Sequence, residues 1–144
     1  TRGSIADMIQ ESGYFYEKSE IFDKFLGDGA KAYIPSTKLP TKEGIQILKD
    51  AGAIAVLAHP VLLKKSKVEE IVAMGIDGIE AYYPSNRQED TNRLKDIARK
   101  NQLLVTAGSD FHKFEDYKHG TLGQVVLKNK ELDRFLTALR GDAK

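Results

Sequence analysis

The spacing of apolar residues changes near Pro40. Before this residue, apolar side chains recur at helical intervals in two stretches, one ending at Gly13 and one running from Ser19 to Leu26. After it, short apolar runs alternate with amphipathic stretches, as in α/β proteins. The pattern predicts a small helical subdomain over residues 1–40 and an α/β region over residues 41–144.

Four apolar runs of the second region predict β-strands, at 53–58, 78–82, 103–106 and 124–127. Helices are expected from Thr41, from a capping box at 66–69, over 88–100 and over 132–139. Alternating strands and helices imply right-handed crossovers and a parallel sheet. Because a closed (β/α) barrel takes about 250 residues, we expect a partial barrel with open sheet edges or a missing partner.

Composition excludes several classes of protein. Lys and Arg number 22 against 21 Asp and Glu, so no basic excess indicates nucleic acid as a bulk electrostatic partner. The absence of cysteine excludes disulfides and thiolate metal sites and suits a reducing compartment. No apolar run approaches the roughly 20 residues of a membrane helix. We therefore expect a cytoplasmic soluble protein and no membrane partner. Because the chain begins at Thr1, we also expect a fragment or processed piece.

Polar residues with metal-binding side chains follow the predicted strands. They are His59, Glu80, Asp110 and His112, and the carboxyl ends of parallel strands meet at one edge of a sheet. Imidazole and carboxylate suit Zn, Mn or Fe. Three of them also have purely structural interpretations: a His-Pro turn for His59, an ion pair for Glu80, and an N-cap or Asx turn for Asp110.

Two further groups are interpreted as structural. His119 precedes Gly120 in a predicted loop, and we interpret it as a surface residue. Five aromatic residues of the first 40 are expected to form the core of the helical subdomain rather than a platform for stacking bases: Tyr14, Phe15, Tyr16, Phe22 and Phe25.

Three segments together resemble a known family. They are residues 55–60 (AVLAHP), 78–80 (GIE) and 108–112 (GSDFH), and they resemble the PHP (polymerase and histidinol phosphatase) superfamily. Residues 22–27 with 32–35 look like the helical insertion of its bacterial metal-dependent phosphoesterases related to 3′,5′-nucleoside bisphosphate phosphatases. The resemblance covers nearly the whole chain.

The resemblance implies a distorted (β/α)7 barrel with two or three divalent metal ions, Mn, Zn or Fe, at its mouth. Residue by residue, His59, Asp110 and His112 match family metal ligands and are the expected catalytic residues. Glu80 matches an acidic position common in the subgroup. Arg2, Asn86 and Arg87 are polar donors in the insertion or near the strand ends, and they are candidate contacts to the phosphate of a substrate.

The implied reaction is hydrolysis of a phosphate ester, with a nucleotide or short oligonucleotide as the expected substrate. The family's opening His-x-His motif and the Asp, His and Glu ligands that follow it are absent from this sequence, which bears on activity. Ser4 stands where the subgroup often has His, which bears on substrate contacts near the insertion. We therefore expect the fragment alone to be inactive and to self-associate through its incomplete barrel. Two alternatives stay open: a non-catalytic structural or interaction module, and an amidohydrolase on a similar barrel.

Overall fold

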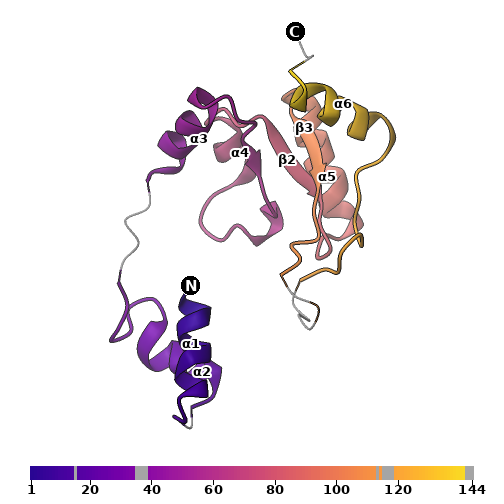
Figure 1. Cartoon of the computed structure of the whole chain (residues 1–144). Coiled ribbons are helices and arrows are strands. Elements are labelled where there is room, and N and C mark those ends of the chain that lie inside the picture. The colour runs from indigo at the N-terminus through magenta and orange to yellow at the C-terminus, as the bar shows by residue number, and fades with distance from the viewer. Residues whose placement is uncertain (15, 35–38, 113, 115–118, 142–144) are drawn as a thin grey trace. The chain divides into compact units, whose positions relative to one another are not determined.

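The computed structural model describes residues 1–14, 16–34, 39–112, 114 and 119–141. The chain divides into two compact units, residues 1–38 and residues 39–144 (Figure 1). Each has its own cluster of buried apolar side chains. Within the described ranges, no helix is both long enough and apolar enough to cross a membrane.

The first unit consists of two short helical segments. Helix α1 spans Arg2–Glu11, and helix α2 (Lys18–Ile21) continues into a π-helical turn, η1 (Phe22–Leu26). The wide turn ends where the Gly27 N–H donates to the Phe22 carbonyl at 2.6 Å. The buried side chains are Ala6, Ile21 and Leu26. Phe15 and Pro35, which belong to the patterns above, lie outside the described residues.

The second unit is α/β with a parallel sheet, as the sequence predicts. The strand order is β1-β2-β3, with β1 at Val56–Leu57, β2 at Gly78–Tyr82 and β3 at Leu104–Ala107. A β-bulge interrupts the pairing of β2 with β3 between Glu80 and Tyr82. The described sheet is open, as in a partial barrel, and its helices are α3 (Thr41–Asp50), the 3₁₀ turn η2 (Pro60–Leu62), α4 (Val68–Val72), α5 (Gln88–Lys100) and α6 (Asn129–Leu139).

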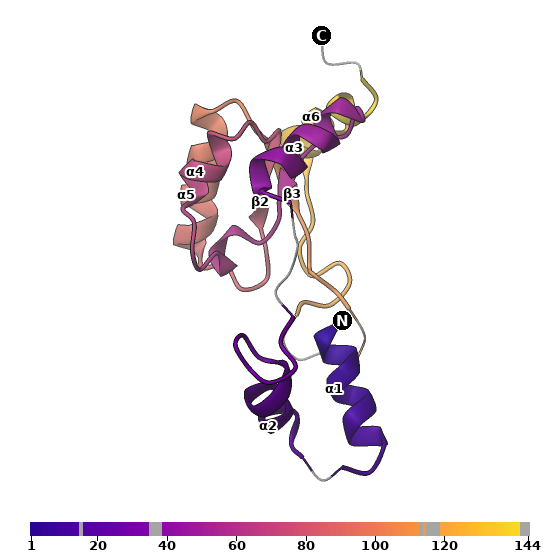
Figure 2. The ribbon, with the colours of Figure 1, turned by 90° about the vertical axis from the view of Figure 1, so that its left-hand side faces the viewer.

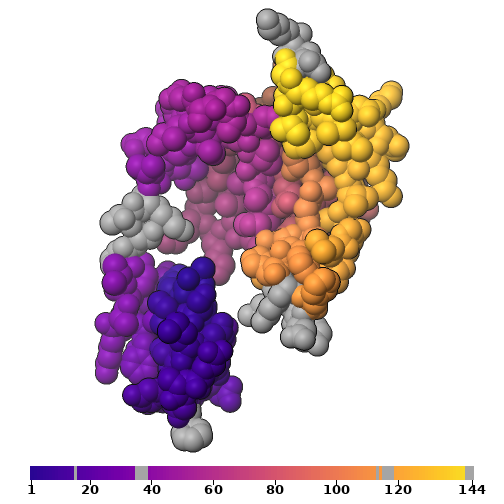
Figure 3. All heavy atoms as spheres, viewed as in Figure 1, coloured from indigo at the N-terminus to yellow at the C-terminus, as the bar shows by residue number. Residues whose placement is uncertain are grey.

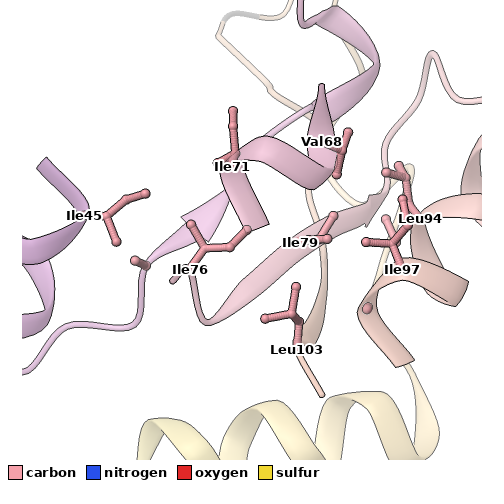
Figure 4. Packing of buried hydrophobic residues seen from close by; sticks show 11 residues of the cluster. Ile45, Val68, Ile71, Ile76, Ile79, Leu94, Ile97 and Leu103 are labelled. Carbon is pink, nitrogen blue, oxygen red and sulfur yellow. The ribbon is translucent and has the colours of Figure 1, made fainter. Parts of the chain in front are cut away.

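One apolar core holds the second unit together. Helices α4 and α5 lie on the same side of β2 and β3 (Figure 2), and their inward side chains meet those of β2 (Figure 4). Leu94 of α5 and Ile79 of β2 are fully buried. Helix α6 packs against β3, and the space-filling view shows it at the same end of this unit as α3 (Figure 3).

The predicted strand at 124–127 is wrong: these residues pair with no strand in the described part of the chain. The run follows a turn in which Gly123 has φ 75°, and it lines a cleft with Tyr82 and Lys95.

Two helix starts also differ from the predicted ones. Thr41 is the first residue of α3 rather than its cap. Helix α4 begins one residue later than the predicted capping box, where the Lys67 N–H donates to Glu70 at 3.1 Å.

A polar cluster joins α6 to the sheet and to α5. The Lys95 ammonium donates to the Tyr82 hydroxyl at 2.7 Å, and that hydroxyl donates to Glu131 of α6 at 2.8 Å. The Lys95–Glu131 ion pair measures 2.9 Å, with the two side chains 39% and 30% exposed. Hydrogen bonds to Tyr82 and Glu131 raise the pKa of Lys95 above its ordinary 10.5.

Lys95→Met is expected to lower the free energy of unfolding by about 0.5 kcal/mol, because solvent screens a pair exposed to this degree. The raised pKa means that the folded state favours charged Lys95. Its contribution is therefore complete below pH 10.5 and is lost as the pH rises through the higher folded-state value. Urea unfolding of both proteins between about pH 7 and pH 11 measures this; a difference that shrinks below about pH 9 would contradict it.

Candidate metal centre

The candidate residues lie at the carboxyl edge of the parallel sheet. His59 follows β1, Glu80 lies in β2, and Asp110 follows β3. His59 has φ 32° and Asp110 has φ 55°, in the left-handed region that non-glycine residues avoid. Such backbone persists only where the surrounding structure holds it, and it gathers at functional sites.

Asp110, His112 and His119 form a group whose candidate ligand atoms all lie within 4.8 Å of one another. The two imidazole rings stack with centroids 4.2 Å apart. His119 Nε2 lies 3.6 Å from Asp110 Oδ2. The loop after β3 returns to the sheet where the Gly120 N–H donates to the Ser109 carbonyl at 2.8 Å, which brings His119 back to Asp110. Our interpretation of His119 as a surface residue is therefore not supported.

The hydrogen bonding of His112 leaves one ring nitrogen available to a metal. Its Nδ1 lies 2.6 Å from the Asp110 carbonyl oxygen. A carbonyl oxygen only accepts hydrogen bonds, so Nδ1 carries the proton in this contact. In the neutral ring with this tautomer, the lone pair lies on Nε2, which is the atom that can bind a metal.

His59 lies beside this group and is not part of it among the described residues. Tyr83 connects the two: its ring centroid is 5.8 Å from that of His59, and its hydroxyl donates to Asp110 Oδ2 at 3.2 Å. Glu80 fixes the backbone of His59 by accepting its N–H at 2.7 Å. The structure thus brings together two of the three predicted ligands, Asp110 and His112. Tyr83 and His119 were not predicted as site residues.

Two groups of the site have raised pKa values. Burial raises the pKa of Glu80 above 4.5, against the opposing effect of the His59 N–H that it accepts. Burial, followed by the negative charge of Asp110, raises the pKa of Tyr83 above 10.0. Tyr83 therefore stays protonated and keeps donating its hydroxyl hydrogen to Asp110 at neutral pH.

The predicted phosphate contacts occupy three different settings. Asn86 Nδ2 donates to the Ala81 carbonyl at 2.8 Å, while its Oδ1 is buried with no hydrogen-bond partner among the described residues. Arg87 lines a cleft of about 460 Å³, which Pro60, the residue after His59, also lines. Arg2 lies in the first unit, where its guanidinium donates to the Leu26 carbonyl at 3.0 Å and pairs with Asp28 at 2.9 Å.

Gly108→Ala is expected to destabilise the chain by about 1–2 kcal/mol. An added Cβ would collide with Glu80 Oε1, so the half-buried carboxylate would have to leave the His59 N–H. Gly44→Ala is the matched control, because nothing lies within 4 Å of its added Cβ in the middle of α3. Alanine at that position should stabilise by about 0.5–1 kcal/mol. Urea unfolding measures both; equal effects would contradict the placement of Glu80.

Comparisons with known proteins find relatives of this chain among enzymes that act on phosphate esters. The chain is 29% identical over 118 residues to the 5′-3′ exoribonuclease Rnm of Escherichia coli, which covers 78% of this chain and 40% of that protein. It is 26% identical over 118 residues to the 3′,5′-nucleoside bisphosphate phosphatase of Chromobacterium violaceum, with 78% and 41% covered. A crystal structure from Bifidobacterium adolescentis, described as that of a metal-dependent phosphoesterase, superposes with a TM-score of 0.71 at 30% identity.

That structural match covers 95% of this chain and 50% of the other. No family model matches the chain. The chain spans about 40% of the length of these two curated relatives. Taken with the parallel sheet and the polar residues at its strand ends, these similarities confirm the resemblance of the chain to the metal-dependent phosphoesterases of the PHP superfamily.

Proposed function

We propose that this chain contributes the Asp110 side of the metal centre of a phosphoesterase that hydrolyses phosphate esters of nucleotides or short oligonucleotides. The observation that carries the proposal is the convergence of Asp110, His112 and His119 at the carboxyl edge of the sheet. The relatives support the reaction class, since their names describe an exoribonuclease and a nucleoside bisphosphate phosphatase.

The donor set fits a divalent metal ion. One carboxylate oxygen and two imidazole nitrogens lie close enough together to bind one ion, and this mixture suits Zn, Mn or Fe. Such an ion, when bound, neutralises phosphate charge and makes water a better nucleophile. In our proposal His59 serves the same centre, together with further ligands when two or three ions are bound.

The surrounding residues hold these ligands in place. The Tyr83 hydroxyl donates to Asp110 Oδ2 and leaves Oδ1 free of that bond. The Asp110 carbonyl orients the His112 ring, and Glu80 holds the strained backbone of His59. In this proposal a histidine that is not a metal ligand, or an ordered water, protonates the leaving alkoxide. Asn86 and Arg87 are the proposed contacts to the substrate phosphate, and Arg87 lines the cleft that also includes Pro60.

The test uses the complete gene product that contains this chain, supplied with Mn²⁺ or Zn²⁺. It should release phosphate from a 3′,5′-nucleoside bisphosphate or a short 5′-phosphorylated oligoribonucleotide, and it should leave cyclic amides intact. Asp110→Asn and His112→Ala should each lower kcat/KM by about 100-fold or more. Even the mutation of a residue that only hydrogen-bonds to a metal ligand typically lowers metal affinity or activity by about 10–100-fold. Amide hydrolysis, or phosphate release that survives Asp110→Asn, would refute the proposal.

We also propose that the 144-residue chain alone is inactive, because its described ligand cluster provides for one ion and the implied centre needs two or three. We propose as well that the protein is located in the cytoplasm. Phosphate release by the isolated chain at the rate of the complete protein would contradict this part.

The isolated chain is further expected to self-associate. Among the described residues, strand β1 pairs only with β2, and Val56 is 36% exposed beside an apolar cleft that Phe135 and Leu139 of α6 also line. Open strand edges with apolar neighbours recruit other chains. Light scattering at micromolar concentration measures the mass of the particle in solution; a stable monomer would contradict this expectation.

A further inference from the structure

The first unit contains an apolar pocket that the metal centre does not use. The pocket has a volume of about 300 Å³ and is lined by Ile9, Tyr14, Tyr16 and Phe25. Tyr14 is 65% exposed and Tyr16 is 36% exposed. Our expectation that these aromatic residues form the core is wrong for the two tyrosines, because Ala6, Ile21 and Leu26 already fill the space between the short helical segments.

Local contacts hold the rim of this pocket in shape. Gly13 turns the chain after α1 with φ 86°. The Tyr16 N–H donates to the Tyr14 carbonyl at 2.9 Å, and Gln10 Nε2 donates to the Tyr16 carbonyl at 3.2 Å. The rings of Tyr16 and Phe25 meet edge to face at 5.9 Å. The pocket is thus formed before any ligand arrives.

The chemistry of the pocket favours a flat, aromatic ligand without charge. Lys24 Nζ lies 4.7 Å from the centroid of the Tyr16 ring and covers one side of it, whereas Tyr14 makes no ring contact among the described residues. The volume lies at the lower end of ligand pockets, which run from about 300 to 1,000 Å³. Stacking of a base on an aromatic side chain contributes about 1–3 kcal/mol.

The local charges argue against a phosphate group as the bound moiety. Residues 1–38 contain five Lys or Arg and six Asp or Glu. Lys24 pairs with Glu20 at 3.2 Å, and Lys18 pairs with Asp7 at 2.5 Å. A groove that follows a nucleic-acid backbone would carry a positive surplus, so the ring system is the part that fits.

We infer that the pocket formed by Ile9, Tyr14, Tyr16 and Phe25 binds a nucleobase, stacked on the exposed face of Tyr14. The choice of a nucleobase among flat ligands rests on the proposed function. The site itself involves no phosphate and no metal, and therefore binds a nucleoside in the absence of both.

The test measures binding of 2-aminopurine riboside, a fluorescent nucleoside, to the whole chain without metal. Stacking on Tyr14 should quench its emission, and Ile9 methyl signals should shift in NMR spectra. Tyr14→Phe keeps the ring and should bind as well as wild type. Tyr14→Leu keeps apolar area but lacks the flat face, and it should bind about tenfold more weakly. Tyr33→Leu is the control, because Tyr33 lies under Arg2 and outside the pocket.

The outcomes separate this inference from the proposed function. Asp110→Asn should leave nucleoside binding unchanged, so nucleoside binding supports the inference even if the complete protein hydrolyses no phosphate ester. Three results would overturn it: no quenching by wild type, equal affinity of Tyr14→Leu and Tyr14→Phe, or equal shifts at Ile9 with ribose 5-phosphate. Because Tyr14 is exposed, all variants should fold, and circular dichroism checks that they do.

Discussion

Asp110→Asn is expected to abolish divalent metal binding by this chain. Asparagine preserves the shape of the side chain and still accepts the Tyr83 hydroxyl hydrogen, but it lacks the negative charge that compensates the loss of metal hydration. The wild-type chain should bind one Zn²⁺ or Mn²⁺ weakly, because its described cluster offers three ligands. The variant should bind neither ion, even at metal concentrations about 100-fold higher than those at which the wild-type chain binds. Isothermal titration calorimetry measures both.

Controls distinguish coordination from a general loss of negative charge. Asp96→Asn removes the same charge from the exposed surface of α5, where Asp96 pairs with Arg99 at 3.3 Å, and it should bind metal like the wild type. His112→Ala and His119→Ala should each weaken binding. Retained binding in His119→Ala would remove that residue from the site. A tight one-to-one zinc complex of the wild-type chain would contradict the view that further ligands complete the centre.

Leu94→Ala is expected to lower the free energy of unfolding by about 3 kcal/mol, within the range of 2–5 for buried leucines. Leu94 is fully buried in the core between α5 and β2, so truncation leaves a cavity that the surrounding side chains fill only in part. Leu139→Ala in α6 makes the same chemical change at a residue 62% exposed, and it should cost about 0.5 kcal/mol or less. Urea unfolding measures both; similar losses would show that the core lies elsewhere.

The sequence predicted those elements whose own residues determine them. Strand β2 and helix α5 have the expected bounds, because each combines a clear apolar period with a distinct start and end. Asp110 and His112 could be placed together because they are two residues apart in one segment. The apolar run at 124–127 led to a wrong strand prediction, because a strand requires a partner in register and not suitable residues alone.

The remaining parts of the site depend on tertiary structure. His119 reaches Asp110 only because the loop from residue 108 returns to the sheet at Gly120, and no spacing rule describes that return. Tyr83 follows the bulge in β2, and a bulge redirects the side chains beside it. The sequence signal for Tyr83 was its position directly after the strand that carries Glu80. The alternation of side chains along that strand does not by itself predict that Tyr83 turns toward Asp110.

The small core of the first unit affects how readily its backbone opens. Units of fewer than about 40 residues seldom stay folded on a few apolar contacts, and here three buried side chains form the centre. Amide protons of α1 should therefore exchange with solvent deuterium through frequent local opening, whereas those of α5 and β2 exchange only in rare, larger events. A ligand that binds the closed form alone slows such opening. A ligand bound in the pocket formed by Ile9, Tyr14, Tyr16 and Phe25 would thus slow the exchange of amide protons along α1.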